Sequence, residues 1–130
     1  MRSILLLTVA MIFTSLPLSA SEIPSKESVI GLNSAFIPGG FDSTSDVYAI
    51  VSGIYPNSCY SWKRAEVEPT DGQNVIRVTA VASVTQGMCM MVLVPFQREV
   101  LIGTLPVGDY TLRFSNGEGT YFDEALSIEQ

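Results

Sequence analysis

The sequence predicts an all-β protein, a sandwich of about seven or eight short antiparallel strands closed by one disulfide. Three observations carry this prediction. Short runs rich in Val, Ile, Tyr and Phe recur between turn residues, no stretch keeps a helical period, and the chain holds two cysteines. Runs of this length with regularly spaced turn signals are typical of two packed antiparallel sheets.

Residues 1–20 have the pattern of a cleavable secretory leader. Arg2 gives a positive start, an apolar run covers Ile4–Leu18, and small residues precede a predicted cut after Ala20. A membrane-spanning helix needs about 20 apolar residues, and this run is shorter. We therefore expect residues 1–20 to be removed as a signal peptide. Residues 21–130 are then expected to form a single domain with no membrane insertion after cleavage.

The residues after the cut bear on the compartment. Ser21 stands where a bacterial lipoprotein signal has its cysteine, and no asparagine starts an N-glycosylation sequon. An unlipidated periplasmic or secreted protein is the expectation. In an oxidising compartment an even cysteine count indicates a disulfide, so we expect Cys59 to pair with Cys89. Such a bridge stabilises the fold by about 3 to 4 kcal/mol on the chain-entropy model.

The predicted strands follow the apolar runs of the mature chain. A polar stretch, Ser21–Glu27, precedes them and is expected to be a loose arm. Pro95 breaks the chain between two runs. Asn116-Gly117 predicts a two-residue hairpin turn, which needs positive φ at both central residues. The runs are Val29–Ile37, Val47–Ser52, Cys59–Val67, Val75–Val84, Met88–Val94, Arg98–Ile102, Tyr110–Ser115 and a return from Thr120 that ends near Ile128.

Two of these runs differ in pattern. In Val75–Val84 the apolar side chains alternate onto one face, with Val81 as the exception, and this alternation indicates a strand with one buried side. Met88–Val94 is apolar on both faces, which predicts a central or covered strand. The same double-sided apolarity fits a face that packs on a second copy, so a homo-oligomer stays open. The alternating residues are Ile76, Val78, Ala80, Ala82 and Val84.

A late segment carries a motif of immunoglobulin-like domains. Leu105–Tyr110 resembles the turn that enters a late strand of immunoglobulin-like and fibronectin-like domains, where a tyrosine hydroxyl bonds back to the preceding loop. Here that residue is Tyr110. Trp62, shortly after Cys59, is similar to the core tryptophan of these folds. Cys89 precedes Tyr110, whereas the immunoglobulin pattern puts its second cysteine just after the tyrosine, so the bridge is not the standard one between sheets.

Over roughly the last two-thirds of the mature chain, the sequence also resembles a loose group of small exported bacterial proteins with an immunoglobulin-like β-sandwich. The resemblance implies this fold and no active site, because its elements are structural. The matching residues are Pro56 and Asn57 ahead of Cys59, then Cys89, Pro95, Phe96, Val100, Gly103, Gly108 and Tyr110.

The sequence offers little for catalysis. Histidine is absent, which removes the commonest general base and the commonest transition-metal ligand. Glu66 with Glu68, and Asp123 with Glu124, are paired carboxylates of the kind used in glycoside hydrolysis. Solvated charges that protect sheet edges explain them more simply. We therefore expect no enzyme activity.

No metal or cofactor site is expected. Met88, Met90 and Met91 with Cys89 offer soft ligands for Cu(I). Alternation on a strand would split these ligands between two faces, and gap filling in a core is the simpler explanation. Asp71–Asn74 lacks the further acidic ligands of a calcium loop and is expected to be a hairpin turn.

Aromatic residues and charge bear on the partner. Tyr55 and Tyr60 flank a Pro-Asn turn and are the candidate contact residues, because aromatic side chains are common at recognition surfaces. Core filling accounts for Trp62 and Tyr48. The chain has 7 basic and 13 acidic side chains, a net charge of −6, and such a surface repels nucleic acid and anionic lipid.

The function expected is an exported, non-catalytic binding or structural module of the cell envelope or medium, with an unknown protein or glycan as its partner. The alternative is a secreted inhibitor of a hydrolase such as a lysozyme or a protease. Acidity, small size and a disulfide suit that alternative.

Overall fold

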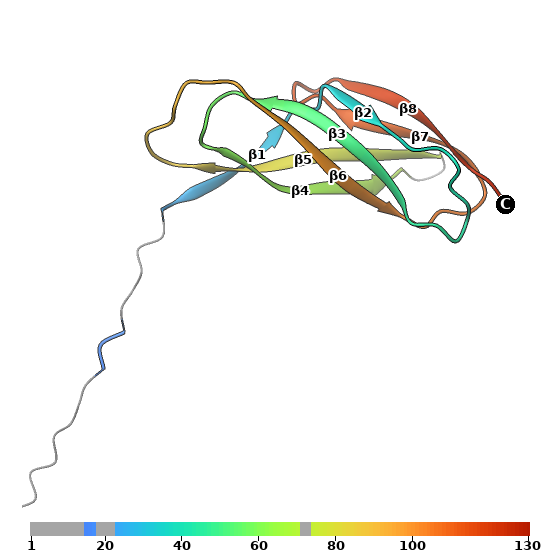
Figure 1. Cartoon of the computed structure of the whole chain (residues 1–130), viewed down its shortest axis with the longest axis horizontal. Coiled ribbons are helices and arrows are strands. Elements are labelled where there is room, and N and C mark those ends of the chain that lie inside the picture. Colours follow the sequence, from blue (N-terminus) through green and yellow to red (C-terminus); the bar gives the residue numbers. More distant parts are fainter. Residues whose placement is uncertain (1–14, 18–22, 71–73) are drawn as a thin grey trace, which may run out of the picture.

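The computed structural model describes residues 15–17, 23–70 and 74–130 (Figure 1). The predicted signal peptide and its cleavage point lie almost wholly outside these residues, as does the Asp71–Asn74 turn except for its last residue. Across the described ranges, no helix is long and apolar enough to cross a membrane.

Eight strands form two sheets that pack on each other, which confirms the predicted all-β sandwich; the described residues contain no helix (Figure 1). The five-stranded sheet contains β1 (Ser25–Ile30), β4 (Tyr60–Pro69), β5 (Val75–Thr85), β7 (Gly108–Ser115) and β8 (Tyr121–Ile128). The three-stranded sheet contains β2 (Ser34–Phe36), β3 (Val47–Tyr55) and β6 (Val94–Gly103).

β5 is the centre of the five-stranded sheet. β4 pairs along one of its edges, while β1 and β7 share the other, β1 opposite Ala80–Thr85 and β7 opposite Val75–Val78. β7 runs parallel to β5, so the prediction of antiparallel strands throughout is wrong at this pair. The chain enters β7 from β6 in the other sheet, and such a crossover allows a strand to lie parallel to its new neighbour.

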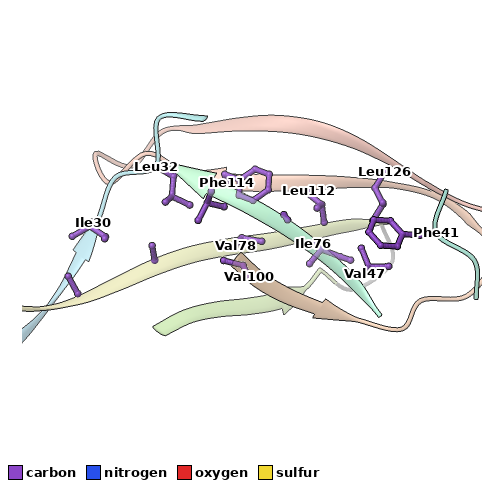
Figure 2. Packing of buried hydrophobic residues seen from close by; sticks show 14 of the residues in the cluster. Ile30, Leu32, Phe41, Val47, Ile76, Val78, Val100, Leu112, Phe114 and Leu126 are labelled. Atoms are coloured by element: carbon purple, nitrogen blue, oxygen red, sulfur yellow. The ribbon is translucent and has the colours of Figure 1, made fainter. Parts of the chain in front are cut away.

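The core lies between the sheets and is built from alternate strand positions (Figure 2). The predicted inward face of β5 is buried at every position except Val84, which is half-buried near the end of the strand. The largest fully buried side chains are Phe114, Leu32, Leu112, Val47, Val51 and Val78. They come from both sheets and from the link between β1 and β2, so the two layers close on one core.

Val81, the exception in that alternation, is also buried, with 4% of its surface exposed. In register it lies between Val29 of β1 and Arg64 of β4. The aliphatic stem of an arginine can cover an apolar neighbour while its guanidinium stays in water. The Arg64 guanidinium is held across β5 by the Glu27 carboxylate, 2.9 Å away. Side chains of the neighbouring strands thus shield this valine on the outer face.

The first predicted strand is in fact two strands. β1 begins at Ser25, inside the stretch expected to be a loose arm, because its backbone pairs with the last half of β5. The run Val29–Ile37 divides after β1, where the chain passes from one sheet to the other. A side chain at Gly31 would clash with the backbone of Asn116, so glycine permits this close passage.

Two turn predictions are wrong. Asn116 has a negative φ, and positive φ occurs at Gly117 and Gly119, so the loop is longer than a two-residue hairpin. Its ends are joined by a hydrogen bond from the Asn116 N–H to the Thr120 carbonyl, 3.1 Å long. Pro95 does not separate strands but lies inside β6. β6 is an edge strand, where the missing N–H of proline can face away from the partner strand.

The Met88–Val94 run does not form a central strand. Met88–Leu93 is an exposed connection between β5 and β6, and Val94 alone of this run belongs to a strand. The predicted disulfide is confirmed: Cys89 is bonded to Cys59, with 5.4 Å between their Cα atoms. This bond holds the connection beside the β3–β4 turn, and the connection joins neither sheet. Its apolar composition alone therefore led to the wrong prediction of a strand.

The tyrosine motif is confirmed. The Tyr110 hydroxyl donates a hydrogen bond to the Pro106 carbonyl, 2.8 Å away, at the start of β7. This contact is the one expected where an immunoglobulin-like domain enters a late strand. Trp62 is partly buried against the core.

Candidate functional site

A groove lies along the open side of the sandwich, between the edges of the two sheets. Its walls are β4 and β6, each of which is paired on one side only. Its volume is about 500 Å³, and ligand sites commonly measure about 300 to 1,000 Å³. β4 contributes Tyr60 and Trp62, β6 contributes Phe96 and Arg98, and Tyr55 lies at the end of β3.

Four aromatic rings connect these strands. The ring centre of Tyr55 lies 4.3 Å from that of Phe96, and the two rings are nearly parallel. Tyr60 stacks at 6.1 Å from Tyr55, and Trp62 is tilted against Phe96 at 6.0 Å. Tyr60, Trp62 and Phe96 are half-buried, so each ring is both packed and accessible. Aromatic surface of this kind gives a ligand large contact area at little cost in side-chain entropy.

A glycine positions this cluster. Gly53 of β3 lies directly opposite Phe96 of β6. A Cβ atom at position 53 would come within 2.5 Å of the Phe96 ring. The missing side chain therefore lets the Phe96 ring lie across the backbone of β3 and against Tyr55, and this ring then forms part of one wall of the groove.

Tyr55 brings a buried polar atom to the groove. The residue is 5% exposed, and its hydroxyl has no hydrogen-bond partner in the described part of the chain. Burial raises the pKa of this phenol above its usual value, and the positive charge of Arg98 partly opposes that shift. The hydroxyl therefore keeps its proton at neutral pH. Buried hydroxyls normally have a partner, but this oxygen is not accessible, so a ligand in the groove meets the Tyr55 ring rather than its hydroxyl.

Arg98 brings a positive charge to the same groove. It lies opposite Val51, whose side chain is buried, so Arg98 projects from the inner side of β6 at the open edge. The salt bridges of the described residues involve Lys63, Arg64 and Arg113 but not Arg98. Its guanidinium is thus available to an anionic group, which arginine can bind with two parallel hydrogen bonds.

The disulfide and two hydrogen bonds fix the end of the groove. The Ser58 N–H donates to the Met90 carbonyl, 3.1 Å away, and the Met90 N–H donates to the Ser58 hydroxyl oxygen, 2.7 Å away. Cys59, the next residue, is bonded to Cys89. Ser58 lines the groove, so the loop that carries the methionines is tied to the rim of the groove by covalent and polar contacts.

The same loop presents apolar side chains to solvent. Met88 is fully exposed, Met91 is 83% exposed and Leu93 is 73% exposed. Figure 1 shows the β5–β6 connection at the end of the sandwich opposite to the C-terminus. Methionine side chains are flexible and adapt to irregular apolar surfaces. The loop therefore combines adaptable side chains with a fixed backbone.

The candidate carboxylates are not brought together. Glu66 on β4 pairs with Arg64 at 3.0 Å, and Asp123 on β8 pairs with Arg113 at 2.9 Å. β4 and β8 are the two opposite edges of the five-stranded sheet. The Arg113 guanidinium lowers the pKa of the Asp123 carboxyl. Within the described ranges, no group of three His, Cys, Asp or Glu side chains is placed to hold a metal ion.

The predicted contact residues differ in their accessibility. Tyr60 is half-buried on the wall of the groove, whereas Tyr55 is buried and reaches the groove as part of its lining. Sequence reasoning missed Phe96 and Arg98. The signal was present: these two residues are two positions apart, so they share the inner side of a strand that includes Pro95. Treating the proline as a strand break concealed that pattern.

The fold and the groove define a disulfide-closed β-sandwich domain with an aromatic, partly polar hollow on its open side. A family model described as the ORF11 beta-sandwich domain matches residues 49–123. This segment is more than half of the chain, so the chain belongs to that family. It includes the groove residues and both cysteines. Neither a curated protein nor a solved structure matches the chain.

Proposed function

We propose that the protein is an exported, non-catalytic binding module of the cell envelope or the medium, and that the groove between β4 and β6 is its binding site. The observation that carries this proposal is the groove itself, which Tyr60, Trp62 and Phe96 line with half-buried rings. Arg98 adds a positive charge without an ionic partner among the described residues. Aromatic rings and arginine together offer a ligand contact area and charge complementarity, which is the combination that a binding site uses.

The proposed location is the periplasm or the medium. The secretory pattern of residues 1–20 supports export. The Cys59–Cys89 disulfide fits an oxidising compartment. The resemblance to small exported bacterial proteins with an immunoglobulin-like sandwich supports the same location, and the acidic surface argues against nucleic acid as the partner.

The residue types of the groove support binding rather than catalysis. Trp62, Tyr60 and Arg98 belong to the three residue types that dominate the binding energy of protein interfaces. A groove that is already formed requires little ordering when its ligand arrives. Residues Met88–Leu93, the methionine loop, add exposed apolar side chains beside the groove. We expect truncation of Trp62 to cost about 2 kcal/mol or more of binding free energy.

Affinity capture with matched variants tests the proposal. Tagged wild-type protein, Trp62→Ala and Lys26→Glu are exposed under oxidising conditions to envelope and medium extracts, and in parallel to a glycan array. The expected result is one stoichiometric species bound by wild type and by Lys26→Glu but lost with Trp62→Ala. Lys26 is an exposed residue of β1 that does not line the groove. Equal capture by Trp62→Ala, or no ligand in either arm, would contradict the groove as a binding site.

A second candidate function is inhibition of a hydrolase. The observation that favours it is Met88–Leu93, an exposed loop whose backbone is fixed by the disulfide and by Ser58. A loop held in one conformation binds an enzyme without paying for its own ordering. A panel of lysozymes and proteases, assayed at stoichiometric protein, tests this function. Inhibition that disappears with Met91→Asp would support it, and unchanged rates across the panel would remove it.

A further inference from the structure

The two walls of the groove are strand edges, and this fact bears on what the groove binds. A strand paired on one side only presents N–H and C=O groups on its other side, spaced to pair with another extended chain. β6 is ten residues long and pairs with β3 alone. Its register with β3 is continuous from Val94 to Leu101. Pro95 leaves this edge without an N–H near the start of β6, so the part that can accept an added strand runs from Gln97 to Leu101.

The opposite wall is less suited to pairing. β4 has a register shift between Trp62 and Arg64, and such a bulge re-aims the backbone of an edge. Lys63 and Arg64 are drawn across the outer face by Glu27, at 2.7 and 2.9 Å. Bulges and charges of this kind protect an edge against pairing. β6 has no such register shift between Val94 and Leu101, so of the two walls it presents the more regular edge.

The side chains on the inner side of β6 define what the added strand carries. Phe96 and Arg98 are two positions apart and so lie on the same side of the strand. Phe96, with Trp62 opposite it, offers an apolar contact. Arg98, without an ionic partner among the described residues, offers charge complementarity to a carboxylate. Residues facing this pair on an added strand would have the same spacing of two.

We propose that the groove binds an extended peptide segment of a partner protein as an added strand on the edge of β6. The segment carries an apolar residue against Trp62 and Phe96, and an acidic residue two positions away against Arg98. This inference rests on the proposed function and names the ligand class of the same groove. The net charge of −6 repels an anionic polymer, so a single acidic residue in a mostly neutral segment fits better than an acidic glycan or a nucleic acid.

A charge-swap selection tests the side-chain half of the proposal. A phage library of random linear heptapeptides is selected on oxidised protein expressed from the full chain, and in parallel on Arg98→Glu, Trp62→Ala and Lys26→Glu. We expect wild type and Lys26→Glu to enrich an aromatic or aliphatic residue two positions from Asp or Glu. Arg98→Glu should replace the acidic residue by Lys or Arg, because the charge preference is inverted, and Trp62→Ala should enrich no motif. An unchanged motif with Arg98→Glu would overturn the proposal.

Backbone pairing is tested with synthetic peptides. The enriched peptide is compared with versions N-methylated at single positions, which removes one N–H without changing the side chains. On an added strand, methylation at alternate positions should weaken binding at least tenfold, and methylation at the positions between them should have little effect. A uniform response along the peptide would overturn strand addition. Thermal midpoints of the variants that match wild type show that each still folds.

The groove as a binding site and the added strand as its ligand can be rejected separately. If affinity capture finds a Trp62-dependent ligand but the library enriches nothing, the groove is a binding site and its ligand is not a peptide strand. A Trp62-dependent hit on the glycan array would overturn the peptide in favour of a saccharide. If neither experiment gives a Trp62-dependent ligand, both the binding function of the groove and the strand addition are rejected.

Discussion

Two apolar runs lie close together in the chain, and one is buried while the other is exposed. Val75–Thr85 forms the central strand β5, where Val78 is fully buried. Met88–Leu93, a few residues later, is an exposed loop in which Met91 is 83% exposed. In the first run apolar side chains alternate with others that are mostly polar, whereas the second run is apolar at every position and half of its residues are methionines. Apolar content is shared by both runs, so what distinguishes core from surface is the period and the covalent tie of Cys89 to Cys59.

The difference indicates that the two runs have separate roles, one in stability and the other in binding. β5 contacts β1, β4 and β7 and so holds the five-stranded sheet together. The methionine loop contributes little to the core, yet its backbone is fixed at the rim of the groove. Large exposed apolar groups on a fixed backbone are typical of interaction surfaces. We expect stability to reside in the first run and recognition in the second.

The largest expected difference in stability comes from introducing an aspartate into each of the two runs. Val78→Asp should leave no folded protein, because an unpaired buried carboxylate costs several kcal/mol against a domain stability of about 5 to 15 kcal/mol. Met91→Asp should change the free energy of unfolding by no more than about 0.5 kcal/mol. Urea unfolding followed by Trp62 fluorescence measures both. If the two variants unfolded alike, the contrast between core and surface would be lost.

Removal of the disulfide should have the next largest effect. Cys59 and Cys89 are 30 residues apart, and the double substitution to Ser should lower the free energy of unfolding by about 3 to 4 kcal/mol. It should also make Met88–Leu93 a preferred site of limited proteolysis, because the loop is then held by hydrogen bonds alone. Unfolding of wild type in reductant provides the matched control. A loss below about 1 kcal/mol would mean that the polar contacts of Ser58 fix the loop unaided.

Tyr110→Phe tests a loop that is held by one hydrogen bond instead of a disulfide. The substitution removes the hydroxyl that donates to Pro106 and keeps the ring. We expect the free energy of unfolding to fall by about 1 kcal/mol, the usual value for one intramolecular hydrogen bond. The same urea titration measures it. A loss of stability as large as that of the disulfide variant would mean that the Tyr110 hydroxyl stabilises more of the domain than the loop that contains Pro106.

Acid tests the ion pairs that flank β5. Arg64, and then Lys63, lower the pKa of the Glu27 carboxyl from 4.5 to about 2. A lowered pKa in the folded state means that the contribution of Glu27 to stability is present above about pH 4.5 and is lost as the pH falls towards 2. In Glu27→Gln the decline in stability between these values should be shallower. Asp42, whose pKa is lowered to about 2 by Thr44 and Ser45, still contributes in the variant. Parallel pH profiles for the two proteins would contradict the assignment.

Sequence reasoning predicted the parts of the fold that depend on local pattern. Alternation in β5, the cysteine pair and the Tyr110 motif all reflect constraints that a short segment carries by itself. It could not predict the parallel pairing of β7 with β5, because that depends on which sheet edge is still free when the chain returns. The division of the first predicted strand has the same kind of cause, since Gly31 is needed only because Asn116 lies against it.

The groove shows the same limit. Tyr55 and Tyr60 could be singled out because they flank a turn, but their joining with Phe96 and Arg98 requires that β4 and β6 meet across the sandwich. β4 and β6 belong to different sheets and share no backbone pairing, so no local pattern encodes their approach. The burial of the Tyr55 ring is likewise a tertiary property, because this ring stacks on Phe96 of the neighbouring strand.

The smallest expected effect on stability is the one that sharpens the comparison most. After residue 20, the methionines are Met88, Met90 and Met91, all exposed. Hydrogen peroxide should convert all three to sulfoxides at nearly the rate found in urea-unfolded protein, with the thermal midpoint almost unchanged, because oxidation makes polar a surface that contributes nothing to the core. Peptide mass spectrometry follows each residue. Slow oxidation of one methionine would show that it is covered in solution, and a second copy packed on the loop would then be detected by light scattering. Fast oxidation together with weaker capture of the partner would place the loop within the binding surface.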